Sequence, residues 1–447
     1  MSGYSGAHSL RIYPVQSLSG SLKVPGDKSI SHRTAMFAAL ADGSSRIKGF
    51  LESGDCIATL RAMEALGAKV EMCAEDEILV TGTSGRFENP EAPLDMGNSG
   101  TGMRLLTGLL SGFPVRARLE GDRSLSKRPM GRIAEPLRKM GADISLLGGE
   151  DRPPIEVAGG KLKAIEYELP VASAQVKSAI LLAGALAEGK STVWEPRPTR
   201  DHTERIMAGL GLPIRVDGLA ISIEGSGGAP LELPAGDRFV PGDFSSAAFW
   251  MLAALAAGPE GHVIEGVGLN PRRTAFMDVL RRMGAQIDLE SQSGDEGAEP
   301  YGDLRISGDG LTATRVAGDE IPNLIDECPL VAVAGALAEG TSEIADAAEL
   351  RVKESDRIAA VCENLRKCGV AVEEREDGML VEGARGRIAG GVAVDSYGDH
   401  RIAMAMAILA LFAREPILVR DVACVQTSYP GFWEDLESLG AKIEKED

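Results

Sequence analysis

Hydrophobic and polar residues follow two alternating patterns along this chain. Residues 56–66 have apolar side chains at helical spacing and end at Gly67, after which residues 69–72 and 78–81 alternate between apolar and polar side chains. These patterns predict a helix followed by two strands. Segments 179–186 and 331–337 are apolar on nearly every helical face, which predicts helices buried inside a domain. The chain is therefore expected to be an α/β protein.

This pattern of helices and strands is repeated. An amphipathic helix ends in Leu, Met or Cys followed by glycine, and a strand comes next, at Gly67, Gly141, Gly211, Gly284, Gly369 and Gly440. The sequence Val-Pro-Gly-Asp-Lys-Ser at 24–29 also returns as Val-Pro-Gly-Asp-Phe-Ser at 240–245, which is 216 residues later. Both observations predict six repeats in two sets of three.

The repeats divide the chain into two predicted domains. The first comprises residues 22–239 and the second comprises residues 1–21 with 240–447, so the chain crosses between them near 21–24 and 238–241. Residues 291–302 are rich in Gly, Ser, Asp and Glu and are expected to form an exposed loop insertion.

Composition narrows the class of protein. The 447 residues are 44% hydrophobic and 25% charged, which suits two globular domains. No apolar run is long enough to span a membrane, and residues 1–10 do not resemble a secretory signal, so we expect a cytoplasmic protein. A net charge of −19 argues against a nucleic-acid partner. The six Cys and five His residues show no metal-ligand spacing, and no metal is expected.

Polar, often basic residues stand where the buried helices are predicted to begin. Lys28, Ser29 and Arg33 open the first helix, where free N–H groups and the helix dipole favour anions. Other basic clusters lie at 127–132, 199–203, 351–357 and 399–401. For each cluster alone, a capped helix start with solvated charges is the better explanation. Together, in an acidic chain, they predict a pocket for a small ligand with several anionic groups.

Two carboxylates are candidates for acid–base catalysis. Asp326 lies among apolar residues at the entry to a buried helix, and Glu354 lies between Lys353 and Arg357. A carboxylate among cations stays ionised and can accept a proton. Asp326 could instead cap its helix, and Glu354 could be a simple ion-pair partner. Motifs for serine hydrolases, P-loop enzymes and dinucleotide binding are absent from the sequence, so we expect an enzyme without a cofactor.

The motifs at 25–33, 97–104, 127–130, 172–178, 200–204, 351–357 and 398–404 together resemble those of the 5-enolpyruvylshikimate-3-phosphate (EPSP) synthase family, and most closely its bacterial class II branch. The resemblance extends over nearly the whole chain. It implies the inside-out α/β barrel of that family, with two domains of three βαβαββ units each. It also implies transfer of the enolpyruvyl group of phosphoenolpyruvate to the 5-hydroxyl of shikimate 3-phosphate, a step of the shikimate pathway toward chorismate and aromatic amino acids.

The resemblance also implies the roles of individual residues. Shikimate 3-phosphate would be held by Lys28, Ser29, Arg33, Ser173, Gln175, Arg200, Asp326 and Lys353. Phosphoenolpyruvate would be held by Lys28, Gly100, Arg128, Gln175, Arg357 and Arg401. The catalytic residues would be Asp326, which takes the proton of the 5-hydroxyl, with Lys28 and Glu354, which handle the proton on C3.

Two positions modify this expectation. Many class I relatives have a lysine near the C-terminus where this chain has Gln426, which removes one cationic contact to phosphoenolpyruvate. Gly100 leaves room for the inhibitor glyphosate, so we expect inhibition by it. We also expect a monomer.

Two alternative functions would require other residues. UDP-N-acetylglucosamine enolpyruvyl transferases share the fold but use a cysteine on a mobile loop, and the matching segment 125–132 has none. A non-catalytic anion-binding protein on the same fold would be expected to lack Lys28, Asp326 or Glu354, and all three are present.

Overall fold

The computed structural model describes residues 4, 6–149, 151–256, 261–294, 298–308, 310–384 and 386–446. The chain divides into two compact units. One consists of residues 26–241 and 295–299, and we call it the N-unit. The other consists of residues 1–25, 242–294 and 300–447, and we call it the C-unit. The divisions after Pro25 and Pro241 fall a few residues beyond those expected after residues 21 and 239.

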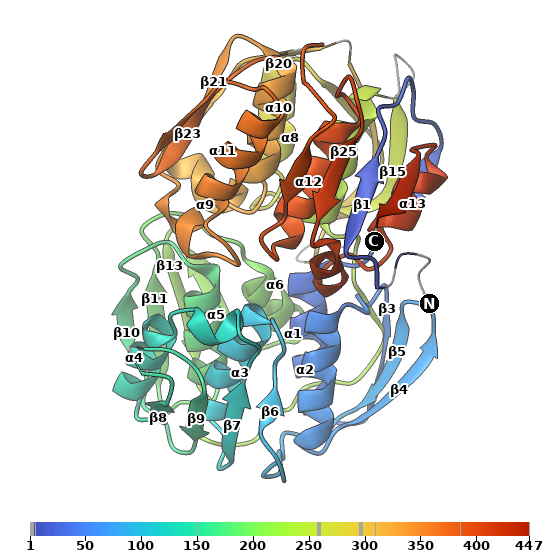
Figure 1. Ribbon diagram of the computed structural model, residues 1–447. Helices are drawn as coiled ribbons and strands as arrows, with labels where there is room; N and C mark the ends of the chain where they lie inside the picture. Colours follow the sequence, from blue (N-terminus) through green and yellow to red (C-terminus); the bar gives the residue numbers. More distant parts are fainter. Residues whose placement is uncertain are drawn as a thin grey trace. The chain divides into compact units, whose positions relative to one another are not determined.

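The N-unit contains three βαβαββ repeats (Figure 1). The first has β14 (Arg238–Phe239), α1 (Lys28–Leu40), β3 (Ser44–Lys48), α2 (Gly54–Ala65), β4 (Lys69–Ala74) and β5 (Glu77–Thr81). The second has β6 (Leu94–Asp95), α3 (Gly100–Ser111), β7 (Arg116–Glu120), the 3₁₀ helix η1 (Leu125–Lys127), α4 (Gly131–Met140), β8 (Asp143–Leu146) and β9 (Ile155–Ala158). The third has β10 (Glu166–Glu168), α5 (Ala174–Gly184), β11 (Lys190–Trp194), α6 (His202–Gly209), β12 (Ile214–Asp217) and β13 (Ala220–Glu224).

The C-unit repeats the same plan. Its first repeat has β2 (Ser21–Lys23), α7 (Phe244–Ala253), η2 (Ala254–Ala256), β15 (His262–Gly268), α8 (Ala275–Met283), β16 (Gln286–Ser293) and β17 (Tyr301–Ser307). The second has β18 (Leu311–Thr312), β19 (Arg315–Val316), η3 (Gly318–Glu320), α9 (Ile321–Leu324), α10 (Cys328–Leu337), β20 (Ala338–Glu339), β21 (Thr341–Ile344), η4 (Ala348–Val352), α11 (Arg357–Lys367), β22 (Val372–Arg375) and β23 (Gly378–Glu382). The third has β24 (Ala393–Asp395), α12 (His400–Ala410), β25 (Ile417–Arg420), η5 (Val422–Thr427), α13 (Phe432–Ser438), β26 (Ile443–Glu446) and β1 (Ser9–Ile12).

Each repeat forms one four-stranded sheet with the same topology. Within this sheet, the strand before the first helix pairs in parallel with the strand after it, as β6 does with β7, and the other pairs are antiparallel. The second repeat of the C-unit has in addition a two-stranded parallel sheet of β18 and β20. The sheets of the N-unit have the orders β14-β3-β5-β4, β6-β7-β9-β8 and β10-β11-β13-β12. Those of the C-unit have the orders β16-β17-β15-β2, β19-β21-β23-β22 and β24-β25-β1-β26. The predicted six repeats, three in each half, are therefore confirmed.

The chain exchanges one strand at each crossover. β2 comes directly before α1 in the sequence but pairs with β15 of the C-unit, while β14 comes directly before α7 but pairs with β3 of the N-unit. The third sheet of the C-unit likewise contains β1 from the start of the chain. β16 continues to Ser293 and β17 begins at Tyr301, so the loop is shorter than the expected 291–302. Residues 295–297 lie outside the described residues.

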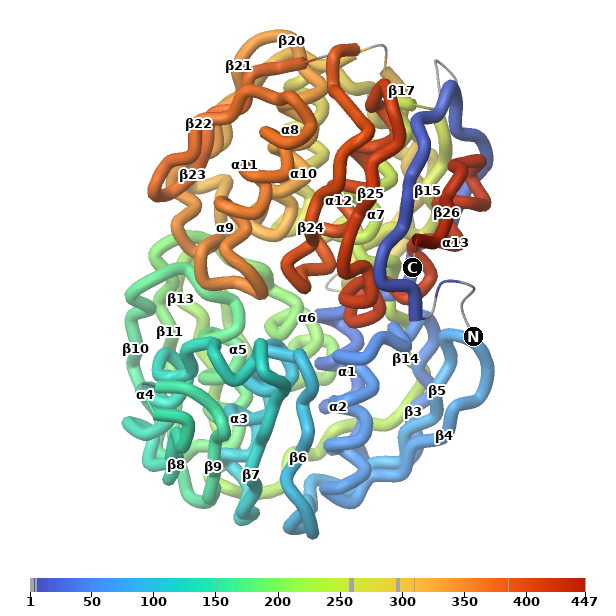
Figure 2. The backbone as a smooth tube through the Cα atoms, in the orientation of Figure 1, coloured from blue at the N-terminus to red at the C-terminus, as the bar shows by residue number. Residues whose placement is uncertain are grey.

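The sheets of each unit surround buried helices (Figure 2). In the N-unit, α3 packs against α1 and α5, and in the C-unit α7, α10 and α12 contact one another. Gly108 in α3 is needed for this packing, because a Cβ there would lie 2.5 Å from the backbone oxygen of Ala179 in α5. Each unit has its own hydrophobic core. The prediction that 179–186 and 331–337 are buried is confirmed for both segments.

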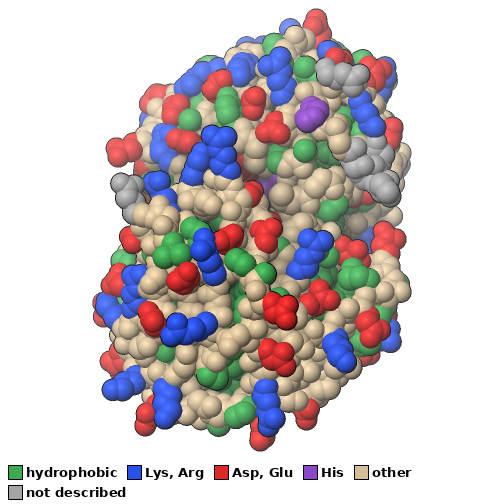
Figure 3. All heavy atoms as spheres, turned by 60° about the horizontal axis from the view of Figure 1, so that its bottom comes forward, with side chains coloured by type: hydrophobic (Ala, Val, Ile, Leu, Met, Phe, Trp, Pro, Cys, Tyr) green, Lys and Arg blue, Asp and Glu red, His purple; other side chains and the backbone are tan. Residues whose placement is uncertain are grey.

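On the face shown in Figure 3, Lys and Arg side chains are interspersed with Asp and Glu, and hydrophobic side chains are scattered singly. Within the described ranges, no helix is long and apolar enough to cross a membrane.

Candidate active site

The first helix of the N-unit begins as its sequence predicts. The Asp27 carboxylate accepts a hydrogen bond from the Ile30 N–H at 2.9 Å and caps α1. Lys28 is the first helical residue, and its Nζ lies 3.1 Å from Oδ2 of Asp55 at the start of α2. Ser29 follows in the same turn. The amine of Lys28 is thus held at the positive end of α1, where an anion is favoured.

Arg33 connects three helices of the N-unit. Its guanidinium donates to Oγ1 of Thr203 in α6 at 2.6 Å, to Oγ of Ser178 in α5 at 2.9 Å and to the backbone oxygen of Ser29 at 2.8 Å. Burial and, to a smaller extent, nearby Arg200 lower the pKa of Arg33 to about 10, although acidic neighbours such as Glu204 oppose the shift. Arg33 therefore stays charged at neutral pH and brings the starts of α1, α5 and α6 together.

Gln175 is held in one orientation. Its Nε2 donates to Oγ1 of Thr101 at 2.9 Å, and its Oε1 accepts from Arg104 at 2.7 Å. Ser173 caps α5 by accepting from the N–H of Val176 at 3.4 Å. These contacts bring the starts of α3 and α5 together.

Two guanidinium groups lie beside Gly100. A Cβ at this position would be 3.0 Å from Nη1 of Arg128 and 3.1 Å from Nη1 of Arg104. Arg128 is buried and donates to Oδ1 of Asn98 at 2.7 Å, while the amide of Asn98 donates to Asp122 at 2.7 Å. Two cations so close together, at the N-terminal end of α3, favour the binding of an anion there.

A buried ion-pair network supports α6. Nζ of Lys177 lies 2.9 Å from Oε2 of Glu195 and 2.7 Å from Oε1 of Glu204. Glu195 also accepts from the N–H and the hydroxyl of Thr199, at 3.2 and 2.6 Å. Because Thr199 directly precedes Arg200, this network fixes the turn on which Arg200 stands.

In the C-unit, Arg357 binds the two candidate acid–base carboxylates. Its side chain is 1% exposed and donates to Asp399 at 2.8 Å, to Asp326 at 3.3 Å and to Glu354 at 2.6 Å. Burial disfavours the charged guanidinium, but Asp399, Glu354 and Asp326 outweigh this effect and raise the pKa of Arg357 above its ordinary value. Nζ of Lys353 lies 3.9 Å from Oδ1 of Asp326. Arg357 is thus enclosed by carboxylates rather than open to a ligand.

Arg401 also lies beside Asp326. Its Nη1 donates to the backbone oxygen of Asp326 at 2.9 Å, and its Nη2 is 3.9 Å from Oδ2 of the same residue. α10 begins at Cys328, and its N-cap position is occupied by Glu327 rather than by Asp326. The alternative role of Glu354 as an ion-pair partner of Arg357 is present in the structure. Gln426 donates to the backbone oxygen of Pro430 at 3.2 Å within its own loop.

Comparison with known proteins identifies the family. The family model described as EPSP synthase (3-phosphoshikimate 1-carboxyvinyltransferase) matches residues 12–436. The chain belongs to the EPSP synthase family. The 3-phosphoshikimate 1-carboxyvinyltransferase of Akkermansia muciniphila is 49% identical over 435 residues, which cover 96% of this chain and 99% of the relative. That of Bacillus subtilis is 46% identical over 428 residues, with 96% and 99% coverage.

Solved structures agree with the EPSP synthase family. The EPSP synthase from Acinetobacter baumannii superposes with a TM-score of 0.86 at 42% identity and covers 98% of this chain and 99% of that one. The enolpyruvyl transferase NikO from Streptomyces tendae has a TM-score of 0.78 at 20% identity, with 98% and 99% coverage, and shows the fold alone. The enolpyruvyl transferase fold predicted from the sequence is therefore confirmed.

The structure groups the predicted residues by unit. The N-unit holds Lys28, Ser29, Arg33, Gly100, Arg128, Ser173, Gln175 and Arg200, and the C-unit holds Asp326, Lys353, Glu354, Arg357 and Arg401. Three residues that the sequence did not mark as site residues also take part in these contacts. Arg104 donates to Gln175, Lys177 binds Glu195 and Glu204, and Oε1 of Glu327 lies 3.6 Å from Nη1 of Arg401. For Arg104 a signal existed, because it follows Gly100 by four residues and must lie one helical turn away on the same face. Lys177 and Glu327 gave no such signal.

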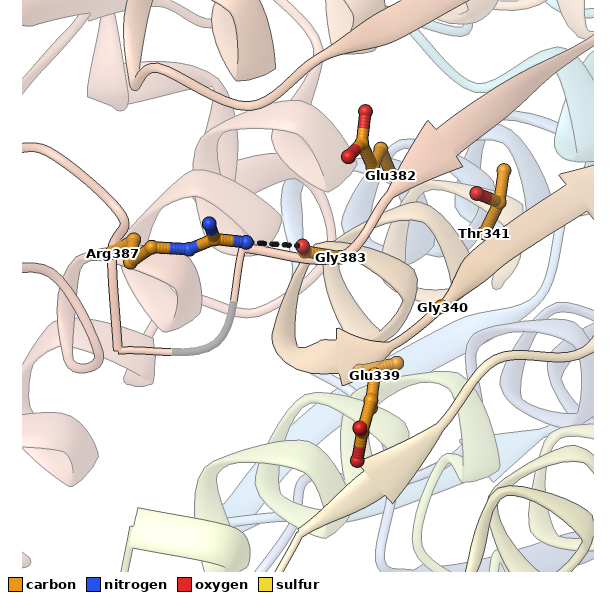
Figure 4. A pocket seen from close by; sticks show the side chains of 7 residues that line it. Glu339, Gly340, Thr341, Glu382, Gly383 and Arg387 are labelled. Atoms are coloured by element: carbon orange, nitrogen blue, oxygen red, sulfur yellow. Dashed lines mark hydrogen bonds between the residues drawn. The ribbon is translucent and has the colours of Figure 1, made fainter.

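A cavity of about 400 Å³ lies elsewhere in the C-unit. It is lined by Ala338, Glu339, Gly340, Thr341, Glu382, Gly383 and Arg387, and Figure 4 shows Arg387 directed at the carbonyl of Gly383. The cavity adjoins the C-terminal end of α10, whereas Asp326 precedes the N-terminal end of that helix. Two carboxylates and a negative dipole end disfavour the anionic substrates of this family.

Proposed function

We propose that this chain transfers the enolpyruvyl group of phosphoenolpyruvate to the 5-hydroxyl of shikimate 3-phosphate and releases phosphate. Membership of the EPSP synthase family supports the reaction. The observation that supports the assigned chemistry is the position of Asp326, whose carboxylate has Arg357 at 3.3 Å and Lys353 and Arg401 each at 3.9 Å. Cations this close favour the ionised carboxylate, which is the form that a general base requires.

The steps follow from these residues. Asp326 accepts the proton of the 5-hydroxyl while the hydroxyl oxygen bonds to C2 of phosphoenolpyruvate. C3 of phosphoenolpyruvate gains a proton in a transfer that we assign to Lys28 and Glu354. The resulting tetrahedral adduct then loses phosphate as its C–O bond breaks, and C3 returns the proton to restore the double bond. Arg128 and Arg401 stabilise the negative charge of the phosphate and carboxylate groups.

The residues that would contact each substrate are assigned as the family resemblance implies. We assign shikimate 3-phosphate to Lys28, Ser29, Arg33, Ser173, Gln175, Arg200, Asp326 and Lys353, and phosphoenolpyruvate to Lys28, Gly100, Arg128, Gln175, Arg357 and Arg401. At Arg357 a substrate carboxylate would compete with Asp399, Asp326 and Glu354, which already accept hydrogen bonds from its guanidinium.

The test is phosphate release from phosphoenolpyruvate, measured with shikimate 3-phosphate, with UDP-N-acetylglucosamine and with no acceptor. Release that requires shikimate 3-phosphate is expected. The variant Asp326→Asn should lose about 100- to 10,000-fold in kcat, the usual contribution of a general base. The exposed Asp288→Asn in the same unit is the matched control and should retain full activity. Release driven by UDP-N-acetylglucosamine, or none with either acceptor, would overturn the proposed function.

Inhibition by glyphosate, a monomeric state and a cytoplasmic location stay predictions. Glyphosate should compete with phosphoenolpyruvate in the same assay, because Gly100 places no Cβ beside the guanidinium groups of Arg104 and Arg128. Light scattering should give the mass of one chain, 47.0 kDa. Noncompetitive inhibition, or a larger particle, would contradict the respective prediction.

A further inference from the structure

The repeated element Val-Pro-Gly-Asp at 240–243 has kept its backbone role but not its chemistry. Asp243 caps α7 by accepting from the N–H groups of Ser245 and Ser246 at 2.7 and 3.3 Å, as Asp27 caps α1. Phe244 replaces the lysine of the first copy, and its side chain is buried in the core of the C-unit. The second copy therefore presents no amine to an anion.

Ser245, the counterpart of Ser29, is instead part of a buried chain of hydrogen bonds. Arg273 donates from Nη2 to Oγ of Ser245 at 2.7 Å and to Oδ1 of Asp243 at 3.3 Å. The hydroxyl of Ser245 hydrogen-bonds with Oε1 of Glu327. Because the guanidinium can only donate and a hydroxyl has one proton, Ser245 accepts from Arg273 and donates to Glu327. The direction of this chain of bonds is fixed.

Glu327 is the last residue of this chain of hydrogen bonds, and it lies next to Arg401. Its side chain is 0% exposed, and Oε1 lies 3.6 Å from Nη1 of Arg401. The same Nη1 donates to the backbone oxygen of Asp326. Among the residues that the structure describes, Oε2 of Glu327 has no hydrogen-bond partner. A fully buried carboxylate is costly unless cations compensate it, and Arg401 lies within ion-pair distance.

We propose that Glu327 is a positioning residue for Arg401, and that Ser245 and Arg273 of the second repeated element hold Glu327 in place. The inference rests on the proposed function, in which Arg401 binds phosphoenolpyruvate. A carboxylate fixed behind the guanidinium restricts Arg401 to the place beside Asp326, so that the cation is already oriented when the anionic substrate arrives. Loss of this orientation weakens the contacts of one substrate and leaves those of the other unchanged.

The test uses steady-state kinetics of the full chain with each substrate varied in turn. Glu327→Gln keeps the shape of the side chain but removes its charge, and should raise KM for phosphoenolpyruvate about tenfold or more. KM for shikimate 3-phosphate should stay within about twofold of the unmodified protein. Glu327→Asp, which restores the charge, should recover part of the loss. Ser245→Ala should raise the same KM by a smaller factor, while the adjacent Ser246→Ala, whose hydroxyl is outside the network, should not.

A double-mutant cycle separates positioning from general damage. In an Arg401→Lys background, Glu327→Gln should have little further effect on KM for phosphoenolpyruvate, because the group it positions is gone. Additive effects, equal rises in both KM values, or identical behaviour of Ser245→Ala and Ser246→Ala would overturn the inference. Failure of the proposed function would be distinguishable from failure of this inference, because the unmodified protein would then show no phosphate release that depends on shikimate 3-phosphate.

Discussion

Replacing Lys177 by methionine is expected to destabilise the N-unit strongly. The Lys177 ammonium lies between Glu195 and Glu204 at 2.9 and 2.7 Å, and the three side chains are 0%, 0% and 5% exposed. Methionine has a similar length and fills the same space, so the packing of α5 is largely kept. What the change removes is the cation that compensates two carboxylates out of contact with water.

The size of the effect follows from this burial. Breaking a buried ion pair by removing one partner costs about 3–5 kcal/mol, because it leaves an uncompensated charge inside the protein. Domains are stable by only about 5–15 kcal/mol in total. For a unit of this length, each kcal/mol changes the melting temperature by about 2–4 °C. The N-unit of Lys177→Met should therefore melt roughly 6–20 °C below that of the unmodified protein.

The assay is thermal unfolding followed by circular dichroism and calorimetry. Lys139→Met is the matched control, because Lys139 forms an exposed bridge to Glu135 at 2.7 Å one turn away on α4, and such bridges add little stability. The double variant Lys177→Met with Glu204→Gln should regain part of the loss, since it removes one of the two orphaned charges. If Lys177→Met melted like Lys139→Met, the buried network would not stabilise α6 in the way argued above.

Three further predictions concern protonation, the anion site and thiol reactivity. Burial and two neighbouring cations lower the pKa of His32 from 6.5 to about 3. The folded state then binds fewer protons than the unfolded state between these values, so stability should fall as pH falls through this window, by up to about 1.4 kcal/mol per pH unit. Urea unfolding at several pH values should show a flatter dependence for His32→Gln, and an unchanged slope would contradict the assignment. Gly100→Ala places a Cβ 3.0 Å from Arg128, and should raise the inhibition constant of glyphosate severalfold in the phosphate-release assay; unchanged inhibition would place glyphosate elsewhere. Cys73 is exposed while the other thiols are buried or partly buried, so a maleimide should label Cys73 first in peptide mass spectrometry, and simultaneous labelling of Cys328 would show that the C-unit core opens.

The repeats could be predicted because their signals are local. A capping residue and the N–H groups it accepts from lie two or three positions apart, as in Asp27 and Ile30. The helix-ending glycines are equally local, since Gly141 and Gly284 adopt φ values of 107° and 110°, which favour glycine. The exchange of β2 and β14 is different, because each pairs with a strand far away in the sequence, as Ser21 does with Val263 and Arg238 with Ile47, and such pairing leaves no mark on the spacing of nearby residues.

The contacts of the candidate site were harder to predict for the same reason. The sequence around Arg357 shows cations and carboxylates together, but not that Asp399 and Asp326, 42 and 31 residues away, both bind its guanidinium. Glu327 lies next to Asp326, yet its hydrogen-bond partner Ser245 is 82 residues away. Residue types at helix starts therefore predict that charges gather, whereas the pairing among those charges depends on the packing of the helices.

The two copies of the Val-Pro-Gly-Asp element show how far a repeat can predict chemistry. In both copies the aspartate caps a buried helix, because capping depends on backbone geometry that the repeat preserves. The residue after the aspartate is not constrained in this way, and it differs between the two copies. Lys28 is partly exposed beside Asp55, whereas Phe244 is buried. Once the second copy lacks an amine, its serine can hydrogen-bond with Glu327 instead of serving a ligand. Repeated positions thus predict the fold, and the positions at which the copies differ separate a side chain that is available to a ligand, Lys28, from one that packs in the core, Phe244.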